Sequence, residues 1–351
     1  MKKITLGQTG ICVPQNAFGA LPVQRADMDT AVAILRRAYE GGMRFFDTAR
    51  AYSDSEEKIG RAFGDMYKDI RSDIYIASKT QATTPEKFWE QLGTSLELLK
   101  TDYIDVYQLH CVPVCYKPGD STGMYECLIK AKEKGLIRHV GITTHKIEVA
   151  FEILNSGLYE TLQYPFSYLA SDREIELVNL AKEKNVGFIA MKGLAGGLIN
   201  NSKAAMAYML KYDNVLPIWG IQKMNELEEW LSFMDEEPVF DEEIKDFIDK
   251  EQERLKGDFC RGCGYCMPCP VGIEINNCAR MSLMLRRAPS AGWLSEENRA
   301  KMAKIEECLH CGRCSSRCPY ELDTPTLLAK NLEDYKKVLS GEVEVGYIEN
   351  H

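Results

Sequence analysis

Eight of the thirteen cysteines in this chain lie in two short segments near its C-terminal end. The first segment reads CRGCGYCMPCP, and the second reads CLHCGRCSSRCP. The eight residues are Cys260, Cys263, Cys266, Cys269, Cys308, Cys311, Cys314 and Cys318. Thiolates at this spacing can bind a metal ion or an iron-sulfur cluster, or can act as redox thiols. Because stable disulfides are not expected in a reducing cell interior, we interpret both segments as metal-binding.

The order of the cysteines favours two 4Fe-4S clusters over two zinc sites. The second segment has the C-x-x-C-x-x-C-x-x-x-C-P spacing of bacterial ferredoxins, and the first is one residue shorter before its last cysteine. We therefore expect the first three cysteines of each segment to share a cluster with the last cysteine of the other segment. The residues between the segments contain helix-like stretches, as in helical ferredoxin domains. Four-thiolate zinc is the alternative, and metal analysis distinguishes the two.

The other five cysteines carry a weaker signal. Cys12, Cys127 and Cys278 are most simply small buried residues. Cys111 and Cys115 flank the region of a candidate active site, where packing is the simpler explanation and a redox or ligand role is the alternative.

Upstream of these segments, β-type runs alternate with helix-type stretches roughly once every thirty residues, as repeated βα units do. The expected strands cover residues 16–20, 44–47, 74–79, 104–110, 139–143, 161–164, 188–192 and 215–220. Eight parallel strands can close into a barrel or form an open doubly wound sheet. Because no G-x-G-x-x-G opens the first helix, we predict an α/β fold of the (β/α)8 TIM-barrel type. The S-x-x-E patterns at 53–56 and 171–174 predict capped helix starts.

Length and composition limit the architecture. At 351 residues the chain suits a barrel of roughly 250 residues plus a small second domain. We expect a barrel in 1–234, a linker helix in 235–257, an α-helical, ferredoxin-like two-cluster domain in 258–330 and a C-terminal tail in 331–351. The net charge of −9 argues against nucleic-acid and anionic-membrane partners. Because the chain has no apolar run of about 18 residues and no signal peptide, we expect a cytoplasmic protein.

Four reactive side chains lie at or near the C-terminal ends of expected strands, where TIM barrels place their active sites. Asp47, Lys79 and His110 end the second, third and fourth strands, and Tyr52 lies just before an expected helix. One such residue alone would usually be a solvated or structural group. Four at equivalent places indicate a catalytic site.

The segments around these residues resemble the aldo/keto reductase family. FFDTARAYSDSEEKIGRAF is similar to its Asp-and-Tyr motif, IASKT to its lysine strand and YIDVYQLHC to its histidine strand. The likeness covers about residues 3–230. With the cysteine segments added, the chain resembles the branch of predicted oxidoreductases with a ferredoxin-type extension. The resemblance implies a barrel that uses NAD(P)H to reduce a small carbonyl compound, or NAD(P) to oxidise an alcohol.

Carbonyl reduction suits the chemistry of the four residues. Tyr52 would protonate the nascent alkoxide, since Lys79 would supply the positive charge that favours its phenolate. Asp47 would pair with Lys79 and keep it charged. His110, as a neutral donor, would orient the substrate oxygen toward Tyr52.

By the same resemblance, a nicotinamide cofactor would lie against the later strands and a glycine loop. The implied contacts are Thr143, Thr144, Gln163, Met191, Lys192, Leu194, Gly196, Gly197 and Gly220. In LAGGL, at 194–198, small residues allow the backbone to approach phosphate closely. Glu226 and Trp230 stand where the family has an arginine for the 2′-phosphate and an asparagine for the adenine. Because Glu226 would repel a phosphate, we expect NADH over NADPH, although the family default is NADP(H).

The two expected redox centres differ in the number of electrons that they transfer. Hydride transfer moves two electrons together, whereas each cluster cycles by one. The clusters are therefore structural, or a flavin in the barrel splits the electron pair, or the substrate reacts by single electrons. The alternative from another class is an electron-transfer subunit whose barrel is a scaffold or a flavin site. A redox protein such as ferredoxin is the expected macromolecular partner.

Overall fold

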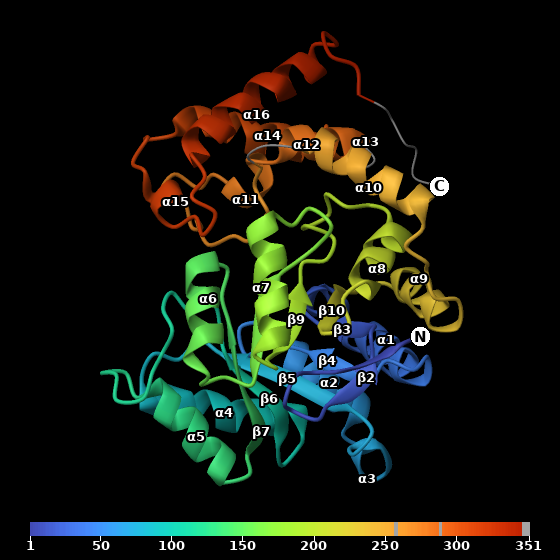
Figure 1. The fold of residues 1–351 in the computed structure, drawn as a ribbon. Helices are drawn as coiled ribbons and strands as arrows, with labels where there is room; N and C mark the ends of the chain where they lie inside the picture. Colours follow the sequence, from blue (N-terminus) through green and yellow to red (C-terminus); the bar gives the residue numbers. More distant parts are fainter. Residues whose placement is uncertain (256–258, 288–289, 346–351) are drawn as a thin grey trace. The chain divides into compact units, whose positions relative to one another are not determined.

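The computed structural model describes residues 1–255, 259–287 and 290–345. The chain forms two compact units. The first contains Met1–Gly193 and Ser202–Lys245, and the second contains Leu194–Asn201 and Asp246–His351 (Figure 1). These units differ from the expected domains at one informative place, because the glycine loop between residues 194 and 201 belongs to the second unit.

The first unit is a closed barrel of eight parallel strands, which confirms the predicted fold. The strands are β3 (Ala17–Gly19), β4 (Phe45–Asp47), β5 (Tyr75–Thr80), β6 (Ile104–Leu109), β7 (Ile137–Thr143), β8 (Thr161–Pro165), β9 (Gly187–Met191) and β10 (Val215–Gly220). They follow one another in chain order around the barrel, and β10 pairs with β3 to close it. Strand periodicity therefore located every barrel strand in the sequence.

Helices alternate with the strands of the barrel (Figure 1). They are α1 (Met28–Glu40), α2 (Ser55–Phe63), α3 (Tyr67–Ile70), α4 (Pro85–Leu99), α5 (Met124–Glu133), α6 (Ile147–Ser156), α7 (Asp172–Glu183), α8 (Ser202–Leu210) and α9 (Met224–Asp235). A short 3-10 helix covers Pro22–Arg25. The expected capping box is present in α7, where Ser171 and Glu174 satisfy each other's backbone N–H groups.

The expected cap at Ser53 is wrong. Helix α2 starts two residues later, and Ser53 has a positive φ of 49°. Glu56 is fully buried instead of reaching back to the helix end, because Ser78 donates a hydrogen bond of 2.5 Å to its carboxylate and Arg50 forms an ion pair with it. A carboxylate buried by an ion pair is unavailable as a cap.

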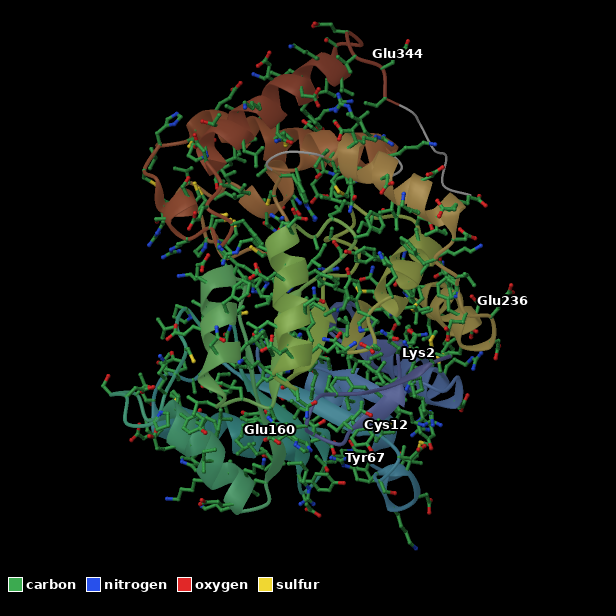
Figure 2. All side chains as sticks on the ribbon, in the orientation of Figure 1. Lys2, Cys12, Tyr67, Glu160, Glu236 and Glu344 are labelled. Carbon is green, nitrogen blue, oxygen red and sulfur yellow. The ribbon has the colours of Figure 1, made fainter. Side chains whose placement is uncertain are left out.

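An N-terminal hairpin that the sequence did not reveal packs against the barrel. Strands β1 (Lys3–Thr5) and β2 (Cys12–Pro14) pair antiparallel. The cluster that joins them to the barrel interior contains Ile4, Leu6, Ile11, Val13, Ala17, Phe45, Ala77, Val106, Ile189, Leu216 and Ile218. Cys12 is exposed, so its expected burial is wrong (Figure 2). On a strand whose alternate residues face the barrel, Cys12 occupies an outward position.

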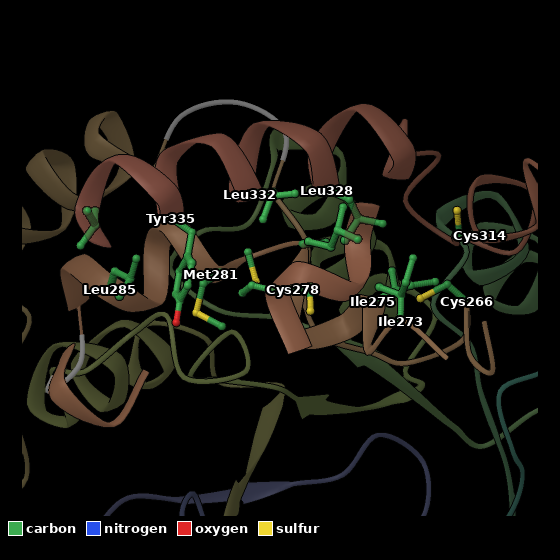
Figure 3. Packing of buried hydrophobic residues seen from close by; sticks show 14 of the residues in the cluster. Cys266, Ile273, Ile275, Cys278, Met281, Leu285, Cys314, Leu328, Leu332 and Tyr335 are labelled. Atoms are coloured by element: carbon green, nitrogen blue, oxygen red, sulfur yellow. The ribbon is translucent and has the colours of Figure 1, made fainter. Parts of the chain in front are cut away.

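The second unit is built from short helices around its own apolar core (Figure 3). They are α10 (Glu242–Arg254), which begins in the first unit, α11 (Ile275–Cys278), α12 (Met281–Arg287), α13 (Ser290–Trp293), α14 (Glu296–Ala303), a 3-10 helix (Lys304–Glu307), α15 (Arg313–Ser316) and α16 (Thr324–Leu339). Helix α16 covers part of the expected tail, and it buries Leu328, Leu332 and Tyr335 in this core. No helix in the described residues is long and apolar enough to cross a membrane.

We expect Leu6→Ala to destabilise the first unit by about 2–5 kcal/mol, because Leu6 is fully buried between the hairpin and the barrel. Denaturant unfolding followed by tryptophan fluorescence measures the change. Val239→Ala is the control, since Val239 is 67% exposed. Equal effects of the two substitutions would show that the hairpin contributes nothing to barrel stability.

Candidate active site and cluster ligands

A buried ion pair joins the second and third barrel strands. Lys79 on β5 donates to Asp47 on β4 over 2.6 Å, and the two side chains are 1% and 2% exposed. Lys79 also donates to the Thr48 carbonyl oxygen at 2.7 Å. Burial raises the pKa of Asp47, and the Lys79 charge opposes that rise. Each charge is retained inside the barrel because the other compensates it.

Two glutamines complete the surroundings of Asp47. Gln108 donates to Gln163 Oε1 at 2.9 Å and lies 3.5 Å from Asp47 Oδ2. Gln163 Nε2 lies 3.5 Å from Asp47 Oδ1. The amide of Gln163, expected to bind the nicotinamide, is thus directed toward the ion pair. Sequence reasoning missed Gln108, whose one signal is a polar residue at an interior strand position.

The ring of Tyr52 lies beside this ion pair. Lys79 Nζ is 4.9 Å from the ring centroid, and the His110 ring meets the Tyr52 ring edge to face with centroids 5.6 Å apart. Among the described residues, no hydrogen bond to the Tyr52 hydroxyl is found. The structure therefore brings all four expected catalytic residues together.

The expected lowering of the Tyr52 pKa is not found. Burial raises the pKa of Tyr52 well above its ordinary value, and the negative charges of Asp47 and Cys111 add to this rise. Burial is the largest cause of this rise in the pKa, because it disfavours the charged phenolate. Tyr52 is consequently a neutral phenol at physiological pH, the form that donates a proton.

His110 is held in its neutral form. Burial lowers the pKa of its imidazole to about 3, and the charge of Lys79 contributes to this. Its Nδ1 atom is buried without a hydrogen-bond partner among the described residues. A neutral imidazole that lacks a hydrogen-bond partner within the protein can donate a hydrogen bond to a substrate oxygen.

The threonines expected near the nicotinamide have hydrogen bonds within the barrel. The Thr143 hydroxyl oxygen accepts from the Cys111 backbone N–H at 2.7 Å. The Thr144 hydroxyl donates to the Val112 carbonyl oxygen at 2.9 Å. Both side chains are buried, so their first role is to hold the ends of β6 and β7 together. Cys111 itself places its sulfur 4.0 Å from His145 Nδ1.

The end of β9 leads into the glycine loop. Met191 and Lys192 are half-buried there, and Lys192 has a positive φ of 59°. Within the loop, Gly196 and Gly197 have φ values of 68° and 93°, which favour glycine. Leu194 begins this segment of the second unit.

An arginine that sequence reasoning missed holds the glycine loop. Arg280 donates a hydrogen bond to the Gly196 carbonyl oxygen. A Cβ on Gly196 or on Gly262 would lie 2.7 Å from the Arg280 Nη1 atom, so both positions require glycine. The space beside Gly196 is therefore occupied by the Arg280 guanidinium group, which also brings positive charge to the loop.

The residues expected near the adenosine have structural roles. Glu226 accepts from the backbone N–H groups of Gln222 and Lys223 at the start of α9. Trp230 is 3% exposed and stacks on Trp219 with ring centroids 4.0 Å apart. Trp230 stands where the family has an asparagine for the adenine, and here its ring is part of the core. Gly220, at the end of β10, is exposed.

The eight clustered cysteines line two pockets in the second unit. One pocket is lined by Cys260, Cys263, Cys266 and Cys318. The other is lined by Cys269, Cys308, Cys311 and Cys314, with Cys266 at its edge. The structure thus groups the cysteines in the sets that their spacing predicts.

The thiols of these pockets fit a group that carries its own positive charge. Burial and the neighbouring thiols Cys260 and Cys263 raise the pKa of Cys266 to about 12. Burial also raises the pKa of Cys260. Metal ions reverse this effect by deprotonating the thiols that bind them. No group of three His, Cys, Asp or Glu residues in the described ranges is placed to hold a single metal ion.

Comparison with known proteins assigns both parts of the chain. The aldo/keto reductase family profile matches residues 15–206, and a 4Fe-4S dicluster domain profile matches residues 259–323. The parallel barrel with its buried Lys–Asp pair is thus an oxidoreductase barrel. The chain belongs to the aldo/keto reductase family and has a C-terminal 4Fe-4S dicluster domain.

Individual relatives match the barrel part alone. The chain is 30% identical to L-galactose dehydrogenase of Arabidopsis thaliana over 212 residues, which are 55% of this chain and 66% of that protein. It is 27% identical to the NADH-specific methylglyoxal reductase of Escherichia coli over 233 residues, or 58% and 70% of the two chains. The chain thus spans about two thirds of the length of these relatives.

Solved structures show the same fold. An aldo-keto reductase from Bacillus halodurans superimposes with a TM-score of 0.62 at 24% identity and covers 72% of this chain and 96% of its own. An aldo-keto reductase from Klebsiella pneumoniae in complex with NADPH gives a TM-score of 0.60 at 21% identity, with 71% and 95% covered.

The pocket assignment gives a test of the cluster ligands. We expect Cys318→Ala to lower the iron content of anaerobically purified protein from about eight to about four atoms per chain, because it removes a ligand from one pocket alone. Iron analysis and visible absorbance measure the loss. Cys278→Ala should keep all the iron, since Cys278 is buried outside both pockets. Unchanged iron in Cys318→Ala would remove that residue from the ligand set.

The low pKa of His110 predicts that kcat/KM does not change at acidic pH through protonation of this residue. Because its pKa of about 3 lies below the ordinary value, the imidazole stays neutral as the pH falls through the usual histidine range. We expect the pH profile of kcat/KM for carbonyl reduction to have no histidine protonation step near pH ~6.5. The wild type and His110→Gln should therefore have the same profile in this range. A step near that pH in the wild type alone would contradict the neutral assignment.

Proposed function

We propose that the barrel reduces a small aldehyde or ketone with a nicotinamide cofactor, or oxidises the corresponding alcohol. One observation carries this proposal: the Tyr52 phenol lies beside the buried Lys79–Asp47 pair and against the neutral ring of His110. A proton donor, a fixed charge and a neutral hydrogen-bond donor are the groups that carbonyl reduction needs.

In this mechanism the protein handles the substrate oxygen and its proton. His110 donates a hydrogen bond to the carbonyl oxygen and directs it toward Tyr52. A nicotinamide, when bound, would supply the hydride for the carbonyl carbon. Tyr52 then gives its proton to the alkoxide, and nearby Lys79 stabilises the phenolate that remains. Asp47 keeps the Lys79 ammonium charged and in place between turnovers.

The proposed nicotinamide contacts lie at the ends of the later strands and in the glycine loop. They are Thr143, Thr144, Gln163, Met191, Lys192, Leu194, Gly196, Gly197 and Gly220. The positive φ values of the loop glycines and the guanidinium of Arg280 support a site for phosphate. One relative is named for NADH and one structural neighbour holds NADPH, so both nucleotides are candidates. The negative charge of Glu226 favours NADH. Glu226 also accepts a backbone hydrogen bond at the start of α9, so helix capping by itself accounts for its position.

We further propose that each cysteine pocket holds one 4Fe-4S cluster. The grouping of four thiols in each pocket supports this proposal. A flavin in the barrel would join two-electron chemistry to one-electron transfer, and extraction of bound cofactors tests for it. The second candidate function is an electron-transfer subunit, which the exposure of Cys311 favours because an exposed cluster is open to a partner. That function requires cluster reduction by dithionite without carbonyl turnover.

The enzyme proposal is tested by Tyr52→Phe. We expect kcat/KM for carbonyl reduction to fall at least about a hundredfold, because the proton donor is removed while the ring remains. Steady-state kinetics with a panel of aldehydes measure the loss, and iron content reports folding of the second unit.

Tyr75→Phe is the matched control. Its phenol lies at the start of β5 and is partly exposed, so its removal should leave kcat/KM within about twofold. Equal rates for the wild type and Tyr52→Phe would exclude Tyr52 as the proton donor. A wild type with reducible clusters and no carbonyl turnover would establish the electron-transfer alternative.

A further inference from the structure

One of the two cysteine pockets opens onto the surface of the second unit. Of its ligands, Cys311 is exposed, whereas each cysteine of the other pocket is buried or half-buried. Leu309 lines the same pocket and is 64% exposed. An electron on a cluster in this pocket would therefore lie directly beneath the surface.

The surface above this pocket carries unpaired positive charge. The segment from Cys308 to Cys318 contains no carboxylate. Arg313 and Arg317 are both exposed, and neither forms an ion pair within the described ranges of the chain. The two are four residues apart, so they lie on one side of the α15 turn.

The two carboxylates directly before this segment are paired with lysines, and the next acidic residues, Glu321 and Asp323, follow it. Glu306 is paired with Lys336 at 2.5 Å, and Glu307 is paired with Lys304 at 2.9 Å. Both carboxylates just before the segment thus have their own lysines. In a chain with a net charge of −9, a segment with two arginines and no carboxylate is locally positive.

We propose that Leu309, His310, Cys311, Arg313 and Arg317 form a docking surface for a small electron-carrier protein whose own redox centre lies in an acidic surface. This surface is called the carrier surface below. The proposal rests on the proposed function in one respect, since it requires a cluster in the pocket that contains Cys311. Single-electron transfer needs close approach of the two centres, and the exposed leucine and thiolate allow it.

The chemistry of the exchange balances without further reactants. One electron leaves the reduced carrier and one reaches the cluster, with no bond formed or broken. Electron-transfer complexes are small and weak, so charge complementarity contributes a large share of their specificity and association rate. The two arginines supply that complementarity for an acidic partner.

The experiment measures binding of a strongly acidic [2Fe-2S] ferredoxin of the plant type to the anaerobically purified holoprotein. Iron content and visible spectrum are recorded first, so that loss of the clusters is recognised separately. Isothermal titration at low and at moderate salt then gives the Kd. We expect Arg313→Glu and Arg317→Glu each to weaken binding at least about tenfold at low salt, and less at moderate salt. Arg313→Lys should restore most of the affinity.

Lys250→Glu provides the matched control, because it reverses one exposed positive charge elsewhere in the second unit. Its Kd should stay within about twofold of the wild type. The proposal is overturned if the arginine variants bind as the wild type does, if basic cytochrome c binds as tightly as the ferredoxin, or if a single-stranded oligonucleotide competes equally. A wild type without iron in the Cys311 pocket would instead refute the proposed function.

Discussion

The buried ion pair between Lys79 and Asp47 determines the chemistry of the barrel. Neither charge would remain inside the barrel without the other, because desolvation of a single ion is too costly. Two glutamine amides surround the carboxylate, and the tyrosine ring lies beside the ammonium. Burial is the main reason that the phenol of Tyr52 stays protonated and the imidazole of His110 stays neutral, and the charges of Asp47 and Lys79 add to these two pKa shifts. The candidate site therefore combines a protonated phenol with a compensated pair of buried charges.

The iron-sulfur unit depends on a different constraint, the meeting of two distant cysteine segments. Each pocket takes thiols from both segments, so neither site is complete until the helices between them have packed. The core in Figure 3 includes Cys266 and Cys314, so the apolar packing and the two pockets share residues. Because Cys266 lines both pockets, the two sites are adjacent.

Sequence patterns predicted the features that repeat and missed those that occur once. The eight strands follow from periodicity, and the grouping of cysteines follows from spacing. Tyr52, Lys79 and their two partners were found because strand ends form the active face of a TIM barrel. Gln108 and Arg280 were missed, since their roles come from contacts between residues far apart in sequence. Glu56 shows the converse, because a local capping pattern was overridden by an ion pair inside the protein.

The contact between Arg280 and Gly196 joins the glycine loop to the C-terminal extension. The glycine loop interrupts the barrel sequence, yet it belongs structurally to the iron-sulfur unit. A gene fragment ending after the last barrel helix would encode every strand but leave this loop without its anchor. The C-terminal extension thus supplies a hydrogen bond to a loop from an earlier part of the chain, because Arg280 binds the Gly196 carbonyl oxygen.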